Sequence, residues 1–292
     1  MRIANVIQRG RPKVVVSDRS GEWLDLTAAL AARQGAGPES IQQLLDAGAF
    51  SPETWRSVVE GKAERFPSAG LTFRPPFSRP GQIIALARNY TAHAQESTLP
   101  APREPIFFSK ANTSVVGPGD PVILPPNLGR IEPEIELAFV ISSRASHVSG
   151  AAADRHIAGY TILNDVSAQE LQAREIRESY PLFRCKSLET FTPMGPWVVT
   201  VDEIGMEPAL AMTLRVNGKP RVCANTGGLT FGIAQLLEFI SGYVALYPGD
   251  VITTGCPKAA GAICPGDEME LEIEGIGILR NPVIAGTEPC PT

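Results

Sequence analysis

The sequence predicts an α+β protein that is mostly β, with a small domain over residues 1–75 and a larger one over residues 76–292. Three observations support this prediction. Helix signals gather in the first 65 residues, short strand-like runs punctuated by glycine and proline dominate from residue 83, and a proline-rich segment without periodicity separates them. We therefore expect a β-rich sandwich or roll decorated by helices, and not a doubly wound sheet.

The small N-terminal domain is expected to be α/β and to begin with two short strands, over residues 2–7 and 13–17. Helices follow. Residues 39–45 have helical apolar spacing, and Ser51-Pro52-Glu53 places a cap, a proline and an acid where a helix N-terminus favours them. The segment over residues 66–76 is the expected domain boundary.

The larger domain contains a series of strand-like runs and few helices. Strands are expected at residues 83–87, 121–124, 131–141, 158–163, 214–216, 251–254 and 269–273, and helices at residues 168–177 and 231–241. Asn217-Gly218 predicts a two-residue hairpin turn, because both central residues of such a turn must tolerate positive φ.

The composition excludes several classes of protein. Charged residues make up 20%, the net charge is −5 and no basic run stands out, which argues against a nucleic-acid or anionic-membrane partner. No apolar run approaches the roughly 20 residues that cross a bilayer, and no secretion signal is evident, so a cytoplasmic location is expected. The 5 cysteines are scattered and indicate neither a disulfide framework nor a zinc knuckle. A small-molecule partner is expected.

Acidic residues lead into and end two of the predicted strands. In the strand over residues 131–141, Glu132, Glu134 and Glu136 project to one face, with Glu134 and Glu136 about 7 Å apart. Asp165 ends the strand over residues 158–163. Each has a plain alternative: the glutamates could form an exposed strand face, and Asp165 could cap the following helix.

Taken together, Glu134, Glu136 and Asp165 would form an all-oxygen site suited to Mg²⁺, Mn²⁺ or Ca²⁺. Zinc is less suited, because no histidine or cysteine lies beside these acids.

Two further segments carry candidate chemistry. In a helix, His93 and Glu96 share a face, so the carboxylate can orient the imidazole and raise its basicity for deprotonating water; the alternative is an incidental surface pair. Lys186 lies in a turn-rich stretch and could neutralise an oxyanion near a metal, or be merely solvated. The turn Thr254-Gly255-Cys256 could offer polar groups to an anion, or be an ordinary turn.

These segments, in this order, resemble the fumarylacetoacetate hydrolase family. The shared patterns are N-Y-x-x-H-x-x-E from Asn89, E-x-E-L from Glu134, a G-Y-x-x-x-N-D-V-S strand end, a K-S-x-x-T-F-x-P-x-G-P-W loop, a V-N-G hairpin and a P-G-D-x-I-x-T-G strand. The resemblance spans roughly residues 80–283.

The resemblance implies a mixed β-sandwich roll, usually a homodimer, with a divalent ion, Mg²⁺ or else Mn²⁺ or Ca²⁺, held by the three matching acids. It also implies a catalytic set and a group of substrate contacts. The catalytic residues would be His93, Glu96 and Lys186, and the substrate contacts would be Tyr90, Thr254, Gly255 and Cys256.

Such a site suits 2-oxo acids whose carboxylate and keto oxygens chelate one metal. The resemblance therefore implies a hydrolase that cleaves a C–C bond of a 2,4-dioxo acid, such as an acylpyruvate, through a metal-stabilised pyruvate enolate. The same enolate logic serves oxaloacetate decarboxylation, dienoate isomerisation and sugar-acid dehydration, and a binder or scaffold without turnover is a further alternative.

The sequence departs from the family pattern near the expected substrate. Gln169 stands where arginine is common, and Glu189 replaces the usual aspartate. Cys256 replaces threonine, and Lys258-Ala259-Ala260 replaces the common glycine-valine. A thiol is a poorer hydrogen-bond partner than a hydroxyl, so we expect altered substrate contacts here.

Overall fold

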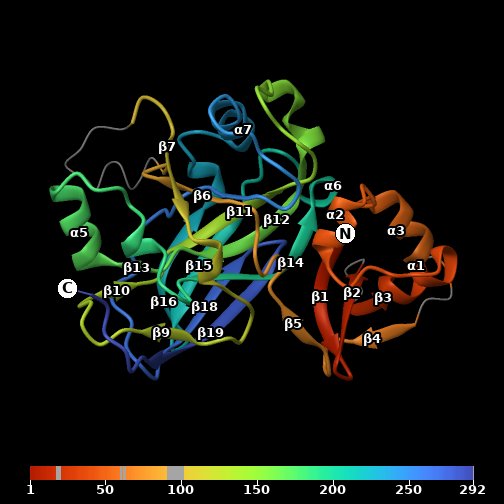
Figure 1. Cartoon of the computed structure of the whole chain (residues 1–292), viewed down its shortest axis with the longest axis horizontal. Coiled ribbons are helices and arrows are strands. Elements are labelled where there is room, and N and C mark those ends of the chain that lie inside the picture. Colours follow the sequence, from red (N-terminus) through yellow and green to blue (C-terminus); the bar gives the residue numbers. More distant parts are fainter. Residues whose placement is uncertain (18–20, 60, 62–63, 91–101, 292) are drawn as a thin grey trace.

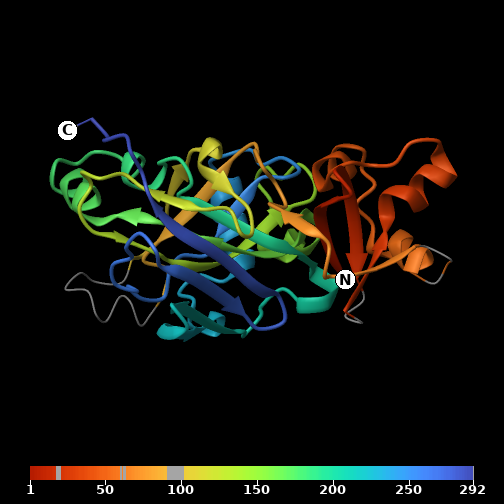
Figure 2. The ribbon, with the colours of Figure 1, turned by 90° about the horizontal axis from the view of Figure 1, so that it is seen from below.

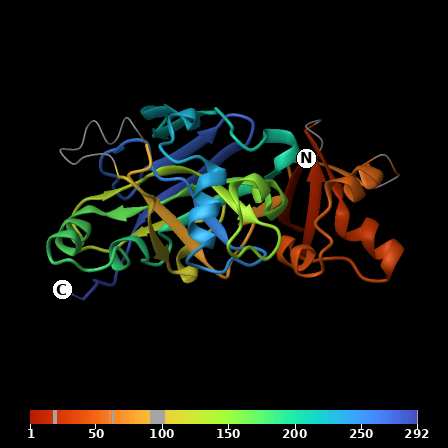
Figure 3. The same cartoon turned by 90° about the horizontal axis from the view of Figure 1, so that it is seen from above.

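A computed structural model describes residues 1–17, 21–59, 61, 64–90 and 102–291. One mixed sheet runs through the molecule, with the N-terminal elements at one end and the C-terminus at the other (Figures 1, 2 and 3). Its strands in spatial order are β4 (Arg65–Pro67), β3 (Glu22–Asp25), β2 (Arg11–Ser17), β1 (Arg2–Gln8), β14 (Thr192–Thr200), β12 (Ile157–Asn164), β11 (Ile135–Ile141), β17 (Val251–Thr253), β6 (Ile83–Ala87) and β7 (Ile106–Lys110). β17 and β6 run parallel, and the other neighbours in this order are antiparallel.

Shorter strands and a second sheet complete the β-structure of the described residues. β5 (Thr72–Arg74) pairs with β1, and β8 (Val115–Val116) pairs with β14. The second sheet has the order β16 (Lys219–Asn225), β15 (Ala211–Val216), β18 (Glu268–Ile273), β19 (Gly277–Ala285) and β9 (Val122–Leu124). A small ladder joins β10 (Ile131–Glu132) to β13 (Ser167–Ala168).

Helices cover the sheets. Those in the described part of the chain are α1 (Leu26–Gln34), α2 (Ile41–Asp46), α3 (Pro52–Val59), α5 (Gln169–Arg177), α6 (Val201–Ile204) and α7 (Ile233–Ser241), with 3-10 turns η1 (Asn112–Ser114), η2 (Gly150–His156), η3 (Arg184–Lys186) and η4 (Thr226–Gly228). Among the described residues, no helix has the length and apolar character that a membrane span requires.

β11 lies at the centre of the fold because its two faces serve two cores. Leu137 and Phe139 enter the core between the two sheets, where α7 also packs. Ala138 and Val140 face the opposite way, into a core that they share with Ile3 and other N-terminal residues. A strand buried on both faces is tolerated here because its side chains alternate between two apolar layers.

The two parts of the chain share a sheet and a core. β1 pairs with β14 through Arg2 with Val199 and Ile3 with Val198. The segment over residues 66–76 also contains strand residues, in β4 and β5, which pair with β3 and β1. Short strands of this kind depend on their partners and leave no clear periodicity in the sequence. A division of the chain near residues 75 and 76 stays a prediction.

The predicted mostly-β class is confirmed, and most expected elements lie where the sequence placed them. The expected strand over residues 131–141 is interrupted between β10 and β11, where Pro133 cannot donate a ladder hydrogen bond. The hairpin between β15 and β16 turns at Asn217 and Gly218 with φ of 53° and 72°. Strands β7, β14 and β19 are among those not anticipated from the sequence, and glycine, proline or charged residues interrupt the patterns of β14 and β19.

A close backbone approach fixes β12 against β14. A Cβ atom built on Gly159 would lie 2.2 Å from the carbonyl oxygen of Val199. We expect Gly159→Ala to lower the free energy of unfolding by about 2 kcal/mol or more, because the backbone must move apart. Gly228→Ala is the matched control: its Cβ would meet nothing closer than 3.6 Å. Urea unfolding of both variants checks this, and equal midpoints would contradict the close approach.

Candidate metal centre and active site

Two antiparallel strands bring the predicted acids together. Glu134 precedes β11 and Asp165 follows β12, and the Asp165 N–H donates to the Glu134 carbonyl oxygen at 2.9 Å. Glu136 lies two residues further along β11. One carboxylate oxygen from each of Glu134, Glu136 and Asp165 lies within 4.8 Å of the others. We call this group the acidic triad.

Lys186, in η3, contacts the acidic triad directly. Its Nζ lies 2.9 Å from Glu134 Oε2 and 2.7 Å from Asp165 Oδ2. It also donates to Ser167 Oγ at 2.5 Å, and the Ser167 hydroxyl donates to Glu134 Oε1 at 2.6 Å. Burial lowers the pKa of a lysine, but Asp165 and Glu134 more than offset this and raise the pKa of Lys186. Lys186 is therefore a cation fixed beside two carboxylates.

A second buried lysine, Lys110 at the end of β7, supports the same acid. Its Nζ donates to Asp165 Oδ1 at 2.5 Å and to the carbonyl oxygens of Lys186 and Phe191. Burial dominates here and lowers the pKa of Lys110, although Asp165 opposes the shift. Lys110 thus ties the loop that carries Lys186 to the strand end that carries Asp165.

The carboxylates of the acidic triad have unequal surroundings. Burial alone would raise the pKa of Asp165, but Lys110 and Lys186 overcome it and lower that pKa. Burial raises the pKa of Glu136 well above its usual value, and the charges of Asp165 and Glu134 add to the shift. Glu136 Oε2 accepts from the Gly255 N–H at 3.0 Å. Glu136 Oε1 is buried with no hydrogen-bond donor among the described residues.

These residues fit a divalent cation. A buried carboxylate oxygen without a partner costs free energy unless a cation or donor meets it. The three acids and two lysines, Lys110 and Lys186, leave one formal negative charge in the buried cluster. Carboxylate oxygens are hard ligands of the kind that Mg²⁺, Mn²⁺ and Ca²⁺ prefer.

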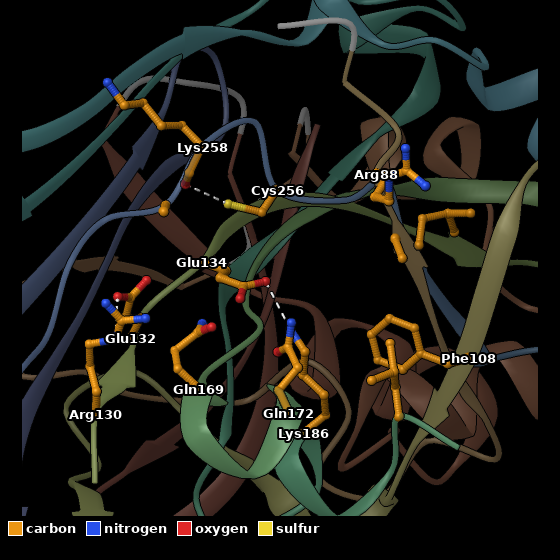
Figure 4. Close-up of a pocket in the computed structure, with 14 residues that line it drawn as sticks. Arg88, Phe108, Arg130, Glu132, Glu134, Gln169, Gln172, Lys186, Cys256 and Lys258 are labelled. Atoms are coloured by element: carbon orange, nitrogen blue, oxygen red, sulfur yellow. Dashed lines mark hydrogen bonds and ion pairs between the residues drawn. The ribbon is translucent and has the colours of Figure 1, made fainter. Parts of the chain in front are cut away.

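A pocket of about 250 Å³ opens onto this cluster (Figure 4). Glu134, 16% exposed, and Lys186 face it from the floor. The other described lining residues are Leu86, Ala87, Arg88, Phe108, Arg130, Glu132, Gln169, Gln172, Leu182, Cys256, Lys258 and Ala259. A pocket smaller than the roughly 300–1,000 Å³ of drug-sized sites suits a small acid.

The structure shows neither of the two alternatives for the acids, an exposed strand face for the glutamates and a helix cap for Asp165. Glu136 and Glu132 are buried, so the glutamates are not an exposed strand face. Asp165 does not cap α5, whose N-cap residue is Ala168. Glu132 stands apart from the acidic triad and contacts the Arg130 guanidinium at 3.3 Å.

The expected substrate contacts lie in different places. Cys256 lines the pocket and donates to the Lys258 carbonyl oxygen at 3.0 Å, and burial, then Glu134, raises the pKa of its thiol. Gly255 contacts Glu136, and the Thr254 hydroxyl donates to the Leu137 carbonyl oxygen at 3.0 Å. The Tyr90 hydroxyl points into the core, 3.3 Å from Met212 Sδ, and Tyr90 does not line this pocket.

Some site residues lie beyond what the sequence indicated. Lys110 and Ser167 were not anticipated, because their roles depend on strand pairing, and no local signal in the sequence marks Lys110. The V-S dipeptide after Asp165 was the only indication for Ser167. His93 and Glu96 lie outside the described residues.

Comparison with known proteins identifies the family. The model of the fumarylacetoacetate hydrolase C-terminal domain matches residues 82–284, so the chain belongs to this family. The human protein named oxaloacetate tautomerase FAHD2A, mitochondrial, is 35% identical over 254 residues, which cover 85% of this chain and 80% of that protein.

Solved structures share the whole fold. A fumarylacetoacetate hydrolase from Exiguobacterium antarcticum superposes with a TM-score of 0.83 at 28% identity, covering 98% of this chain and 100% of that one. A maleylpyruvate hydrolase from Sphingobium sp. SYK-6, solved with manganese(II) and pyruvate, gives a TM-score of 0.78 at 28% identity and the same coverage. The expectation of a fumarylacetoacetate hydrolase fold is confirmed.

Lys110 gives a prediction about stability. We expect Lys110→Met to lower the free energy of unfolding by about 3 kcal/mol, because a buried carboxylate loses one of its cations and two carbonyl groups lose a donor. Urea unfolding measures the change. Lys219→Met, at an exposed hairpin position, is the control and should stay within about 0.5 kcal/mol of the parent protein. An unchanged midpoint for Lys110→Met would refute this role.

Glu136 gives a prediction about metal binding. We expect Glu136→Gln to weaken Mn²⁺ binding to metal-stripped protein by about 100-fold, because the buried oxygen without a donor loses its charge. Isothermal titration calorimetry measures the affinity. Glu132→Gln is the control: it changes a carboxylate of the same pocket outside the acidic triad and should keep the Mn²⁺ affinity of the parent protein. Equal losses in the two variants, or none in Glu136→Gln, would remove the acidic triad as the metal site.

Proposed function

We propose that this protein is a divalent-metal-dependent hydrolase that cleaves a C–C bond of a 2,4-dioxo acid. The observation that carries the proposal is the buried acidic triad with Lys186 at the floor of a small pocket. A 2-oxo acid presents adjacent carboxylate and keto oxygens, and such a floor offers both a cation site and an ammonium to them.

Glu134, Glu136 and Asp165 would hold the metal ion. Bound there, a divalent cation would act as a Lewis acid that polarises the 2-oxo group and favours its enolate. The manganese and pyruvate in the maleylpyruvate hydrolase structure support this class of ion and ligand. Mg²⁺, Mn²⁺ and Ca²⁺ all suit the donor set.

Lys186 would neutralise negative charge as the C–C bond breaks. Its ammonium is held by Asp165 and by the Ser167 hydroxyl, so it does not have to reorganise when charge develops. His93, oriented by Glu96, would deprotonate the water that attacks the distal carbonyl, a role proposed from the sequence pattern. The 2-oxo acid would leave as an enolate and the acyl part as a free acid.

A second reaction class is favoured by one comparison. The human relative is named an oxaloacetate tautomerase, and enolisation of a 2-oxo acid needs the same cation and ammonium without an attacking water. Oxaloacetate decarboxylation, dienoate isomerisation and sugar-acid dehydration pass through related enolates. The discriminating feature is the product.

The remaining expectations are part of this proposal. The substrate is a small 2-oxo acid, nucleic acid and membrane are not partners, and the protein acts as a cytoplasmic homodimer. The human relative carries the word mitochondrial in its name, so location is a point on which the two proteins can differ.

Product analysis tests the reaction class. Mn²⁺-loaded protein is incubated with acylpyruvates, oxaloacetate and 2-keto-3-deoxy sugar acids, and products are followed by NMR. Pyruvate together with a free acid from an acylpyruvate is the expected result. Keto–enol exchange, CO₂ release or loss of water, with acylpyruvates untouched, would replace the hydrolase by the corresponding alternative.

His93 separates turnover from metal binding. We expect His93→Ala to lower kcat by at least about 100-fold and to leave Mn²⁺ affinity unchanged, because the base is lost and the ligands are kept. Glu134→Ala should lose both. His156→Ala, whose ring contacts Ser143 outside the pocket, is the control and should keep both. Near-normal hydrolysis by His93→Ala would remove it as the base.

A further inference from the structure

Three neighbouring strands bring Asn89 close to the acidic triad. β6 and β17 run parallel, so the residues just after them, Asn89 and Thr254-Gly255, lie at the same edge of the sheet. β11 runs antiparallel to β17, and Glu136 near its start lies at that edge too. Asn89 is 1% exposed, and it is not among the described residues that line the pocket. Its side chain is therefore directed at the protein and not at a ligand.

The side-chain amide of Asn89 uses all of its hydrogen-bonding groups on the backbone. Its Oδ1 accepts from the Phe231 N–H at 2.9 Å. Its Nδ2 donates to the Phe231 carbonyl oxygen at 3.1 Å and to the Thr254 carbonyl oxygen at 3.0 Å. A primary amide has two N–H donors and one acceptor oxygen, and each has a partner here. A carboxylate has no such donor and an aliphatic side chain has neither group, so these contacts require an amide.

The contact with Thr254 reaches the acidic triad through a single peptide group. The Thr254 carbonyl and the Gly255 N–H belong to the same planar unit and point in opposite directions from it. Asn89 holds the carbonyl oxygen, while the N–H donates to Glu136 Oε2 at 3.0 Å. Fixing one end of a rigid plane fixes the direction of the other end, and the two hydrogen bonds polarise each other.

The surroundings of this peptide group restrict it further. The Thr254 N–H and hydroxyl both donate to the Leu137 carbonyl oxygen, at 2.9 and 3.0 Å. Gly255 has a φ of 88°, and a Cβ atom built on it would lie 3.2 Å from the Leu86 carbonyl oxygen and 3.3 Å from Asn89 Cβ. Glycine tolerates both this φ and this close approach. Asn89 and the peptide group are therefore held in one arrangement by packing as well as by a hydrogen bond.

We propose that Asn89 is a positioning residue for the metal centre, and that it orients the Glu136 carboxylate through the peptide group between Thr254 and Gly255. Glu136 Oε2 is held by the Gly255 N–H. Glu136 Oε1, which has no donor among the described residues, is then the oxygen presented to a cation. The inference rests on the proposed function only in taking the acidic triad as the metal site, and it requires no particular reaction.

The Mn²⁺ affinity of two matched variants tests the proposal. We expect Asn89→Ala to weaken Mn²⁺ binding to metal-stripped protein by about tenfold or more, the usual cost of losing a group that orients a metal ligand. Asn281→Ala is the control. Asn281 is also buried, and its Nδ2 also donates to two carbonyl oxygens, those of Gly117 and Asp120, at 2.8 and 2.9 Å. It lies outside the acidic triad and the pocket lining, so its variant should keep the affinity of the parent protein while losing stability.

Double variants separate positioning from a general loss of structure. If Asn89 acts through Glu136, Asn89→Ala should weaken Mn²⁺ binding much less in a Glu136→Gln background than in the parent protein. In a Glu134→Gln background the full factor should remain, because the peptide group donates to Glu136. Electron paramagnetic resonance of free Mn²⁺ measures the affinity in each variant, including those that bind weakly.

Hydrogen exchange provides a measurement on the parent protein itself. The Gly255 N–H donates to Glu136 in a protein without a metal ion, so its proton should be protected from exchange in metal-stripped protein. NMR of labelled protein follows this proton. It should exchange faster in Asn89→Ala and at the parent rate in Asn281→Ala. The result for the parent protein tests the arrangement even if Asn89→Ala does not fold.

The outcomes separate this inference from the proposed function. Parent-like Mn²⁺ affinity in Asn89→Ala, an equal loss in Asn281→Ala, or the same factor in the Glu136→Gln background would overturn the role of Asn89. A Gly255 amide proton that exchanges as fast as an exposed one would do the same. The expected affinities in a protein that hydrolyses no 2,4-dioxo acid would overturn the hydrolase alone. A parent protein that binds no Mn²⁺ would overturn both.

Discussion

Carboxylates are buried where β11 begins and β12 ends, and this burial is the constraint on which the site depends. Glu136 and Asp165 are inside the protein, and charge there is tolerated only when it is paired. Lys110 and Lys186 supply that pairing, and the backbone contacts of Lys110 also fix the loop that bears Lys186. The contacts of Lys110 therefore both offset the buried negative charge and position Lys186. Among the described residues, Glu136 Oε1 has no hydrogen-bond donor, and a divalent cation bound there would complete the cluster.

The floor and the rim of the pocket differ in exposure: Lys186 at the floor is buried, whereas Arg130 and Lys258 at the rim are exposed. Under the proposed function, the floor carries the groups that a reaction through a 2-oxo acid enolate requires, and the similar proteins include ones named as hydrolases and one named as a tautomerase. The rim carries Gln169, Cys256 and Lys258, where the sequence departs from the family pattern. Arg130, just before β10, accepts a backbone hydrogen bond from Gln169 at the start of α5. Under the proposed function, the acidic triad and Lys186 set the chemistry, and side chains at the rim can vary without disturbing them.

Much of the fold could be predicted from the sequence, because its strands are short apolar runs with glycine and proline between them. β6 lies at the residues expected, and the Asn217-Gly218 turn follows from local φ preferences alone. β14 and β19 could not be predicted, since prolines and glycines within them are tolerated only by their particular neighbours. β4 and β5 are likewise strands only because β3 and β1 lie beside them.

The sequence by itself indicated Glu134, Glu136, Asp165 and Lys186 as candidates for one site, because carboxylates at apolar strand ends and a matching order of motifs are local features. Tertiary structure alone decided that Glu136 is buried without a donor, that Lys110 neutralises Asp165, and that the Tyr90 hydroxyl turns into the core. These depend on which strands lie side by side and how far water is excluded. Burial and pairing are properties of the packed sheet, and spacing along the chain does not specify them.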